Sequence, residues 1–309
     1  MTVTSEPPSR RLGLPALVLA TLAFALVIPV GFLTLPLTAL VVRTRPWNDK
    51  NLGTTVLATG LSLWWLSGTG TGPEQLVKAW ALIGAVLVGL VAHREWAWIN
   101  RMLMAVAAGA GATFILAVAV GFTWGELVWS IERDLLRSLQ MGTSIMNALG
   151  VPSTGGPDRY GALMVEILPQ IFLGVVALQM LLGMGLAGQL YFRLTTSPSG
   201  AAPGRLQDFS FSEHLGWLVA APLGIVLFGG DFTAHPFAIN LLAVGLGLYF
   251  WRGLAVFWAF FSRAAIPRPL FAVSLVLAIF LMAVTIPMAT VVGVLDTGLD
   301  FRARMKSRE

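Results

Sequence analysis

Long, nearly uninterrupted runs of apolar residues constrain this chain more than any other feature of its sequence. Three of them cover residues 102–122, 160–192 and 236–261. A helix of that length can span the hydrocarbon core of a bilayer. In lipid every backbone polar group needs an internal hydrogen bond, and these runs lack the alternation of barrel strands. The sequence therefore predicts an all-α polytopic transmembrane helical bundle.

The composition supports the same class of protein. Of the 309 residues, 56% are hydrophobic and only 11% are charged, whereas roughly a quarter of a soluble domain is charged. The formal net charge is +5, but the arginines and lysines stand mostly in short connections between apolar runs, which is typical of membrane topology signals. We therefore expect no nucleic-acid partner. The absence of cysteine excludes disulfides and cysteine-based metal sites.

We expect about eight to nine spans, because a span needs about 17–25 apolar residues and two of the candidates are marginal. The candidate segments are residues 14–30, 32–42, 52–66, 76–92, 102–122, 160–192, 215–228, 236–261 and 270–292. The marginal segments, 32–42 and 215–228, are short and each contains a proline. Residues 193–213 are polar and rich in Pro and Gly, so they predict a linker between an N-terminal bundle (1–192) and a C-terminal part (214–309).

Residues 124–149 break the apolar pattern. Leu127, Ile131, Leu135 and Leu139 recur at roughly helical spacing, while charged residues such as Arg133 fall elsewhere. This pattern is typical of an amphipathic helix that lies in the membrane interface. We therefore count this helix apart from the spans.

The arginines and lysines predict the orientation of the chain. If the N-terminus is inside, the basic connections around residues 43–50, 94–101, 193–205 and 263–268 all face the cytoplasm, as the positive-inside rule prefers. The C-terminal tail is also basic. We therefore expect a cytoplasmic C-terminus, an even number of crossings and a place in a bacterial inner membrane.

Three segments and one residue in the last third resemble YybS-like bacterial membrane proteins. They are FSFSEHLGW at 209–217, Asn240, LYFWRGLAV at 248–256 and GVLDTGLDFRAR at 293–304. That family is more remotely similar to the substrate-capture S components of energy-coupling-factor transporters. The resemblance implies a membrane-embedded six-helix binder of a small molecule, driven by a separate coupling subunit and two ATPases. The chain departs from those proteins by three extra C-terminal spans and the insertion at 124–149.

A second feature resembles the S components. Ala16 and Ala20 are four residues apart, and they are similar to the Ala-x-x-x-Ala surface by which those proteins contact their coupling subunit. The resemblance therefore implies that these two alanines are candidate partner contacts.

Arg252 is the first candidate for a functional side chain, because it falls near the middle of the 236–261 run. A central arginine costs about 2.5–3.5 kcal/mol, so it needs a partner or a polar cavity. It could contact an anionic substrate, or form an ion pair with Glu166 or Asp231. Alternatively, the helix breaks at Arg252 and Gly253, and the side chain reaches an interface.

Glu166, Gln170 and Asn240 complete the set of candidate ligand-binding residues. Glu166 and Gln170 are four apart on one helix face, with Pro169 between them loosening the backbone ladder. Glu166 could also reach the outer headgroup region. Asn240 needs a hydrogen-bond partner in the bundle, and contact between helices is the more common role for such a residue.

The C-terminal tail carries Asp296 and Asp300 at i,i+4, followed by Arg302 and Arg304. Two carboxylates at that spacing can bind a cation or act in acid–base chemistry. The more common arrangement is that they cap a helix end and pair with the neighbouring arginines. A tail on the cytoplasmic side could also dock a partner.

The reactive groups that an enzyme needs are scarce. The three histidines are scattered, and the sequence contains no H-E-x-x-H or Walker motif. We therefore expect a non-enzymatic protein, without cofactor or metal, that binds a small molecule or lipid as a capture-like subunit with a membrane coupling subunit. The alternative is a scaffold that recruits cell-envelope proteins. A binder should have a polar-lined cavity near the midplane around Glu166, Asn240 and Arg252, whereas a scaffold should be filled there and carry an apolar groove that faces lipid.

Overall fold

The computed structural model describes residues 30–43, 49–68, 72–92, 94, 96–148, 159–195, 198, 200, 202–229, 235–263, 277 and 281–306. Within these ranges the chain forms α-helices and two short 3-10 helices, and it forms no strand. The prediction of an all-α protein is confirmed for this part of the chain.

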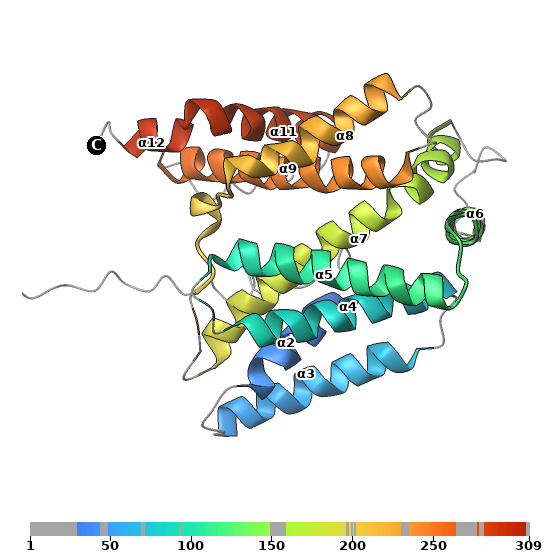
Figure 1. Cartoon of the computed structure of the whole chain (residues 1–309), viewed down its shortest axis with the longest axis horizontal. Coiled ribbons are helices and arrows are strands. Elements are labelled where there is room, and N and C mark those ends of the chain that lie inside the picture. Colours follow the sequence, from blue (N-terminus) through green and yellow to red (C-terminus); the bar gives the residue numbers. More distant parts are fainter. Residues whose placement is uncertain are drawn as a thin grey trace, which may run out of the picture.

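The helices follow one another in a simple order. They are α2 (Val30–Val42), α3 (Asp49–Ser67), α4 (Gly72–Val91), α5 (Trp98–Ala119), α6 (Trp124–Ala148), α7 (Arg159–Leu194), α8 (Trp217–Phe228), α9 (Pro236–Arg263), α11 (Met282–Leu299) and α12 (Phe301–Lys306). The 3-10 helices η1 (Leu206–Asp208) and η2 (Glu213–Gly216) lie between α7 and α8. In Figure 1, α3, α4, α5, α9 and α11 run along the width of the bundle, and α7 crosses it obliquely.

Four described helices are long and apolar enough to cross a membrane. They contain the stretches Gly72–Val91, Trp98–Ala119, Val165–Leu194 and Pro236–Ser262. Three more apolar helices are shorter: Gly31–Val42, Glu213–Phe228 and Val284–Leu299. The expected eight to nine spans are therefore not confirmed. The two marginal segments form helices of 13 and 12 residues, and residues 14–29 and 264–276 lie outside the described ranges.

The core lies where α2, α4, α5 and α7 pack together. Its most deeply buried side chains include Leu40, Val88, Ala105 and Met180, which are at most 1% exposed. α7 has 36 residues and would be about 54 Å long at 1.5 Å per residue. Because the hydrocarbon core is about 30 Å thick, a helix of this length fits best when it is tilted. The oblique course of α7 in Figure 1 agrees with that requirement.

α6 has the orientation that an interfacial helix needs. Its bounds, Trp124–Ala148, agree with the predicted segment 124–149. Figure 1 shows α6 end-on beside one end of the bundle, whereas α4 and α5 run across the view. Leu127 and Ile131 are buried against the bundle, while the outward Trp129 is 60% exposed. The predicted amphipathic helix is therefore present and lies across the bundle end.

Arginines at the other end of the bundle bind the end of α4. Arg43 Nη1 donates hydrogen bonds to the carbonyl oxygens of Gly89 and Leu90, both at 2.8 Å. Arg101 Nη1 donates to the carbonyl oxygen of Ala92 at 3.0 Å. The last carbonyls of a helix have no intrahelical partner and carry partial negative charge, so two cations there stabilise the helix end.

The C-terminal helix lies at this same end. Arg302 Nη1, in α12, donates to the carbonyl oxygens of Gln207 at 3.2 Å and Phe209 at 2.7 Å. The segment that contains Gln207 follows α7, and Gly200 in it lies against Ala92 and Arg101. We call this part of the molecule the arginine-rich end. The α4–α5 connection, the segment after α7 and the C-terminal helix therefore share one end of the bundle.

Candidate functional site

Arg252 forms an ion pair between α9 and α11. Its Nε donates to Asp296 Oδ2 at 2.9 Å, and its Nη2 donates to the Asp296 carbonyl oxygen at 3.2 Å. The side chain of Arg252 is 8% exposed and that of Asp296 is fully buried. α9 continues without a break through Arg252 and Gly253, so a helix break at that point is wrong.

The partner that the structure shows for Arg252 is Asp296, which the sequence did not suggest for it. Glu166 is exposed, and Asp231 lies outside the described residues. The pairing with Glu166 is wrong, because the carboxylate that contacts Arg252 comes from Asp296 on a later helix. The ion pair itself is the arrangement that a buried arginine needs.

Asp296 also binds the tail. Arg302 Nη2 lies 2.9 Å from the same Oδ2 of Asp296, so one buried carboxylate serves two guanidinium groups. The chain leaves α11 at Asp300, whose φ of 43° is left-handed and whose N–H donates to the Asp296 carbonyl oxygen. For Asp296 the sequence suggested either cation binding and acid–base chemistry or pairing with a neighbouring arginine, and the structure shows the pairing. Arg304 and Asp300 are exposed on the surface of the tail.

Glycine makes this ion pair possible by letting α9 and α11 approach closely. A methyl group at Gly253 would overlap the carbonyl oxygen of Ala289, and one at Gly293 would overlap that of Tyr249. Small residues at a helix interface allow such backbone contact in membranes. The close approach places Asp296 within hydrogen-bond distance of Arg252.

Asn240 joins α9 to the backbone of α7. The Gly174 N–H donates to Asn240 Oδ1 at 2.7 Å, and Asn240 Nδ2 donates to the Gln170 carbonyl oxygen at 2.7 Å. Gln170 and Gly174 are four residues apart, so the side-chain amide binds a carbonyl oxygen and an N–H that are one helical turn apart. Nδ2 also donates to the Pro236 carbonyl oxygen at 2.7 Å. The structure thus shows Asn240 in contact between helices.

The structure does not gather the four candidate ligand-binding residues into one cavity. Arg252 and Asn240 direct their hydrogen bonds to protein groups, Glu166 is exposed, and Gln170 is half-buried. A role for these side chains in binding a ligand stays a prediction. Ala16 and Ala20 lie outside the described residues.

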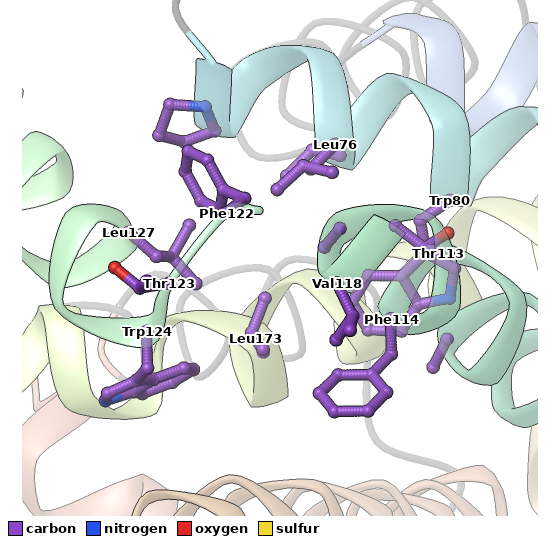
Figure 2. Close-up of a pocket in the computed structure, with 14 residues that line it drawn as sticks. Leu76, Trp80, Thr113, Phe114, Val118, Phe122, Thr123, Trp124, Leu127 and Leu173 are labelled. Atoms are coloured by element: carbon purple, nitrogen blue, oxygen red, sulfur yellow. The ribbon is translucent and has the colours of Figure 1, made fainter. Parts of the chain in front are cut away.

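An apolar cavity of about 160 Å³ lies elsewhere, between α4, α5, α6 and α7. Figure 2 shows Trp80, Thr113 and Phe114 on one side of it, across from Leu127 and Trp124. The full lining is Pro73, Leu76, Val77, Trp80, Ala110, Thr113, Phe114, Ala117, Val118, Phe122, Thr123, Trp124, Leu127 and Leu173. These described residues include no charged side chain.

The cavity borders the outer apolar surface of the bundle. Phe114 and Val118 on α5 line it and are 68% and 60% exposed, whereas Trp80 and Leu127 on its inner side are 6% exposed. Trp80 Nε1 donates to the Val106 carbonyl oxygen at 2.9 Å, so the polar group of this wall is satisfied. The cavity therefore suits an apolar group that enters from the lipid side.

The start of α6, which forms one wall, is held by a capping box. The Thr123 N–H donates to Glu126 Oε2 at 2.8 Å, and the Glu126 N–H donates to Thr123 Oγ1 at 3.3 Å. This reciprocal pattern satisfies two otherwise free donors at a helix start. The hydrogen bonds from the Thr123 N–H and hydroxyl hold the pKa of the Glu126 carboxyl below its ordinary value. The T-x-x-E spacing was visible in the sequence and could have marked this helix start.

The comparisons with known proteins agree with the membrane character of the fold. A search of curated proteins and a search of solved structures found no match. A family described as "Predicted membrane protein (DUF2232)" matches residues 15–297 of the chain. That match covers the described helices from α2 to α9 and most of α11. The chain therefore belongs to this family of membrane proteins.

Proposed function

We propose that this protein is a non-enzymatic integral membrane protein that binds an apolar lipid segment in the cavity between α4, α5, α6 and α7. The observation that carries the proposal is the cavity itself, with its apolar lining and its border on the outer surface. The ligand class follows from the lining, because a site without charged groups favours hydrocarbon over an ion.

The energetics of an empty cavity support this proposal. A space of about 160 Å³ leaves the side chains that line it without dispersion contacts on one side. Apolar cavities do not fill with water. Hydrocarbon from the surrounding bilayer would restore the lost dispersion contacts.

We place the protein in a bacterial inner membrane with the arginine-rich end toward the cytoplasm. The support is the clustering of Arg43, Arg101 and Arg302 at one end of the bundle, because positively charged connections prefer the cytoplasmic side. α6 would then lie in the outer interface, where its apolar face contacts the cavity.

The finer kinship with YybS-like proteins and S components is also part of the proposal. In that case the bound molecule would be captured for a separate membrane coupling subunit. The support is the resemblance of three C-terminal segments and Asn240, together with a binding cavity in the same chain.

A scaffold role is the second candidate, and two observations favour it. The polar side chains of Arg252, Asn240 and Asp296 hold helices together, and an apolar cavity borders the outer surface, as the scaffold interpretation expects. The two candidates differ at the α4–α7 cavity, because only the lipid binder needs an occupant there.

Photolabelling with a phospholipid that carries a diazirine in one acyl chain tests the proposal. In wild-type protein in nanodiscs we expect labels on Trp80 and Leu127, which line the cavity, as well as on the exposed Ile115. Ala117→Phe should fill the cavity and remove the inner labels. Ala112→Phe, at an exposed position on the same helix, is the matched control and should keep them. Inner labels that persist in Ala117→Phe, or that never form in the wild type, would favour the scaffold.

A further inference from the structure

α7 changes its surroundings at Pro169, which lies inside the helix. Pro169 itself is less than 2% exposed, and Met180 beyond it belongs to the core. On the N-terminal side of the proline, Ile167 is 44% exposed and no described side chain of α7 is buried. α7 therefore consists of a loosely packed first arm, residues 159–168, and a packed second arm, residues 169–194.

The backbone hydrogen bonds of α7 are altered where the two arms meet. Proline has no N–H, so Pro169 cannot donate to the Val165 carbonyl oxygen as a residue of a regular helix would. The Gln170 carbonyl oxygen and the Gly174 N–H, which pair with each other in a regular helix, both bond to the amide of Asn240 at 2.7 Å. Helices bend at prolines and where a side chain inserts between such groups. Both conditions meet in this turn, so it resists bending less than the rest of α7.

Asn240 fixes this turn to α9. Its Nδ2 also donates to the Pro236 carbonyl oxygen in its own helix at 2.7 Å, so the amide has a set orientation. A methyl group at Gly174 would lie 2.7 Å from the Asn240 carbonyl oxygen and 2.9 Å from Ala243 Cβ, so the two helices are in close contact here. A neighbouring helix can satisfy the backbone groups that a proline or a bend frees within a membrane. The turn can therefore bend at a fixed point while its polar groups stay paired.

The same turn forms part of the cavity wall. Leu173 lies within it and lines the cavity, and in Figure 2 this side chain appears between Trp124 on α6 and Phe114 on α5. α6 precedes the first arm in the chain, packs against α7 and contributes Trp124 and Leu127 to the lining. A movement of the first arm would therefore carry α6 relative to α5 and change the width of the opening beside Phe114.

We infer that residues 169–174 of α7 form a hinge that controls the access of lipid to the cavity. In the bent position the first arm and α6 move away from α5 and admit a hydrocarbon segment, and in the straight position they close the opening. The inference rests on the proposed function, because it names how the same site is regulated. A bound chain stays connected to its headgroup in the bilayer, so an occupied cavity requires the bent position. Occupancy therefore falls when the bent position becomes rarer.

Distances between two spin labels test the movement. Because the chain contains no cysteine, Ile167→Cys on the first arm can be paired with Val120→Cys at the end of α5, and both positions are exposed. In lipid nanodiscs this pair should give two distance populations. Leu194→Cys on the second arm, also exposed, paired with Val120→Cys is the matched control and should give one narrow population. A single narrow population for the first pair would overturn the inference.

Pro169→Ala supplies the missing N–H and should favour the straight position. One restored hydrogen bond should lower the bent population about fivefold. Labelling of Trp80 and Leu127 by the diazirine phospholipid, measured relative to the exposed Ile115, should fall by the same factor. The melting temperature should not fall, because alanine is favoured over proline inside a helix.

Pro222→Ala is the matched control for this variant. Pro222 is also buried inside an apolar helix, α8, and it is not part of the cavity lining. This variant should change neither the distance populations nor the labelling. Inner labels that form in the wild type and stay unchanged in Pro169→Ala would overturn the hinge while leaving lipid binding in place. Two distance populations without any inner label in the wild type would instead refute the proposed function.

Discussion

Asp296 on α11 accepts hydrogen bonds from Arg252 on α9 and from Arg302 on α12 through the same Oδ2 atom, each at 2.9 Å. One fully buried carboxylate thus compensates two guanidinium groups. Arg302 in turn binds the carbonyl oxygens of Gln207 and Phe209. Asp296 is therefore the centre of the contacts that hold α9, α11, α12 and the segment before α8 together.

We expect Asp296→Asn to destabilise the C-terminal half strongly. The substitution keeps the size of the side chain but leaves Arg252 and Arg302 without a negative partner, and breaking a buried pair in this way costs about 3–5 kcal/mol. The melting temperature of the protein in detergent should fall, and less protein should accumulate in the membrane. Asp300→Asn is the control, because Asp300 is exposed and asparagine tolerates its left-handed backbone. Equal melting temperatures for the two variants would contradict a central role of Asp296.

Asn240→Ala should loosen the contact between α7 and α9. It removes an acceptor for the Gly174 N–H and a donor to Gln170, and we expect a loss of about 1–3 kcal/mol. Thermal unfolding measures the loss. Asn100→Ala, at an exposed position, should leave stability nearly unchanged. A melting curve of Asn240→Ala that overlays the wild type would show that this amide adds nothing to the helix contact.

The start of α6 should depend on pH through Glu126. Because its pKa is lowered in the folded protein, its contribution to stability is present above its ordinary pKa of about 4.5 and is lost as the pH falls through the lower folded value. Hydrogen exchange at Thr123 to Ile131, relative to intrinsic rates, should therefore speed up at acidic pH. Glu126→Gln should remove this pH dependence. An identical acid response in that variant would assign the effect to another group.

The arginine-rich end of the bundle and the opposite end should face different sides of the membrane, which predicts the residues that share a side. The sequence contains no cysteine, so single cysteines can be introduced without further changes. Cysteines at Arg94 and Arg304, both exposed near the arginine-rich end, should react with an impermeant maleimide in inverted vesicles and not in intact cells. A cysteine at Ser67, near the other end of the bundle, should show the opposite pattern. Labelling of Arg94→Cys and Arg304→Cys from different sides would contradict this arrangement.

The sequence predicted the features that depend on neighbouring residues. The helical spacing of Leu127 and Ile131 predicted α6 to within one residue of its observed end, and the apolar run at 160–192 predicted α7. Both signals are local, because periodicity and hydropathy belong to a single helix. The number of membrane spans was harder to predict, because the sequence of a short apolar helix such as α8 does not show whether the helix crosses the bilayer.

The contacts between helices could not be predicted in the same way. Arg252 finds its partner 44 residues later, and Asn240 finds one 66 residues earlier. Their positions showed that each needed a partner, but the choice depends on close approach at Gly253 and Gly174. The cavity was hidden for a similar reason. Its lining comes from four helices and a turn, and the same apolar residue types fill the packed core.

The hydrogen bonds from Arg43 and Arg101 to the end of α4 affect how this chain responds to charge engineering. Removing basic residues is the standard way to ask whether they orient a membrane protein. Here each removal would also uncover carbonyl groups of Gly89, Leu90 or Ala92. If such a variant failed to insert, an unstable end of α4 and an inverted orientation of the protein would give the same result. Adding basic residues to the connections at the opposite end, with Arg43 and Arg101 intact, is therefore the cleaner way to separate orientation from folding in this protein.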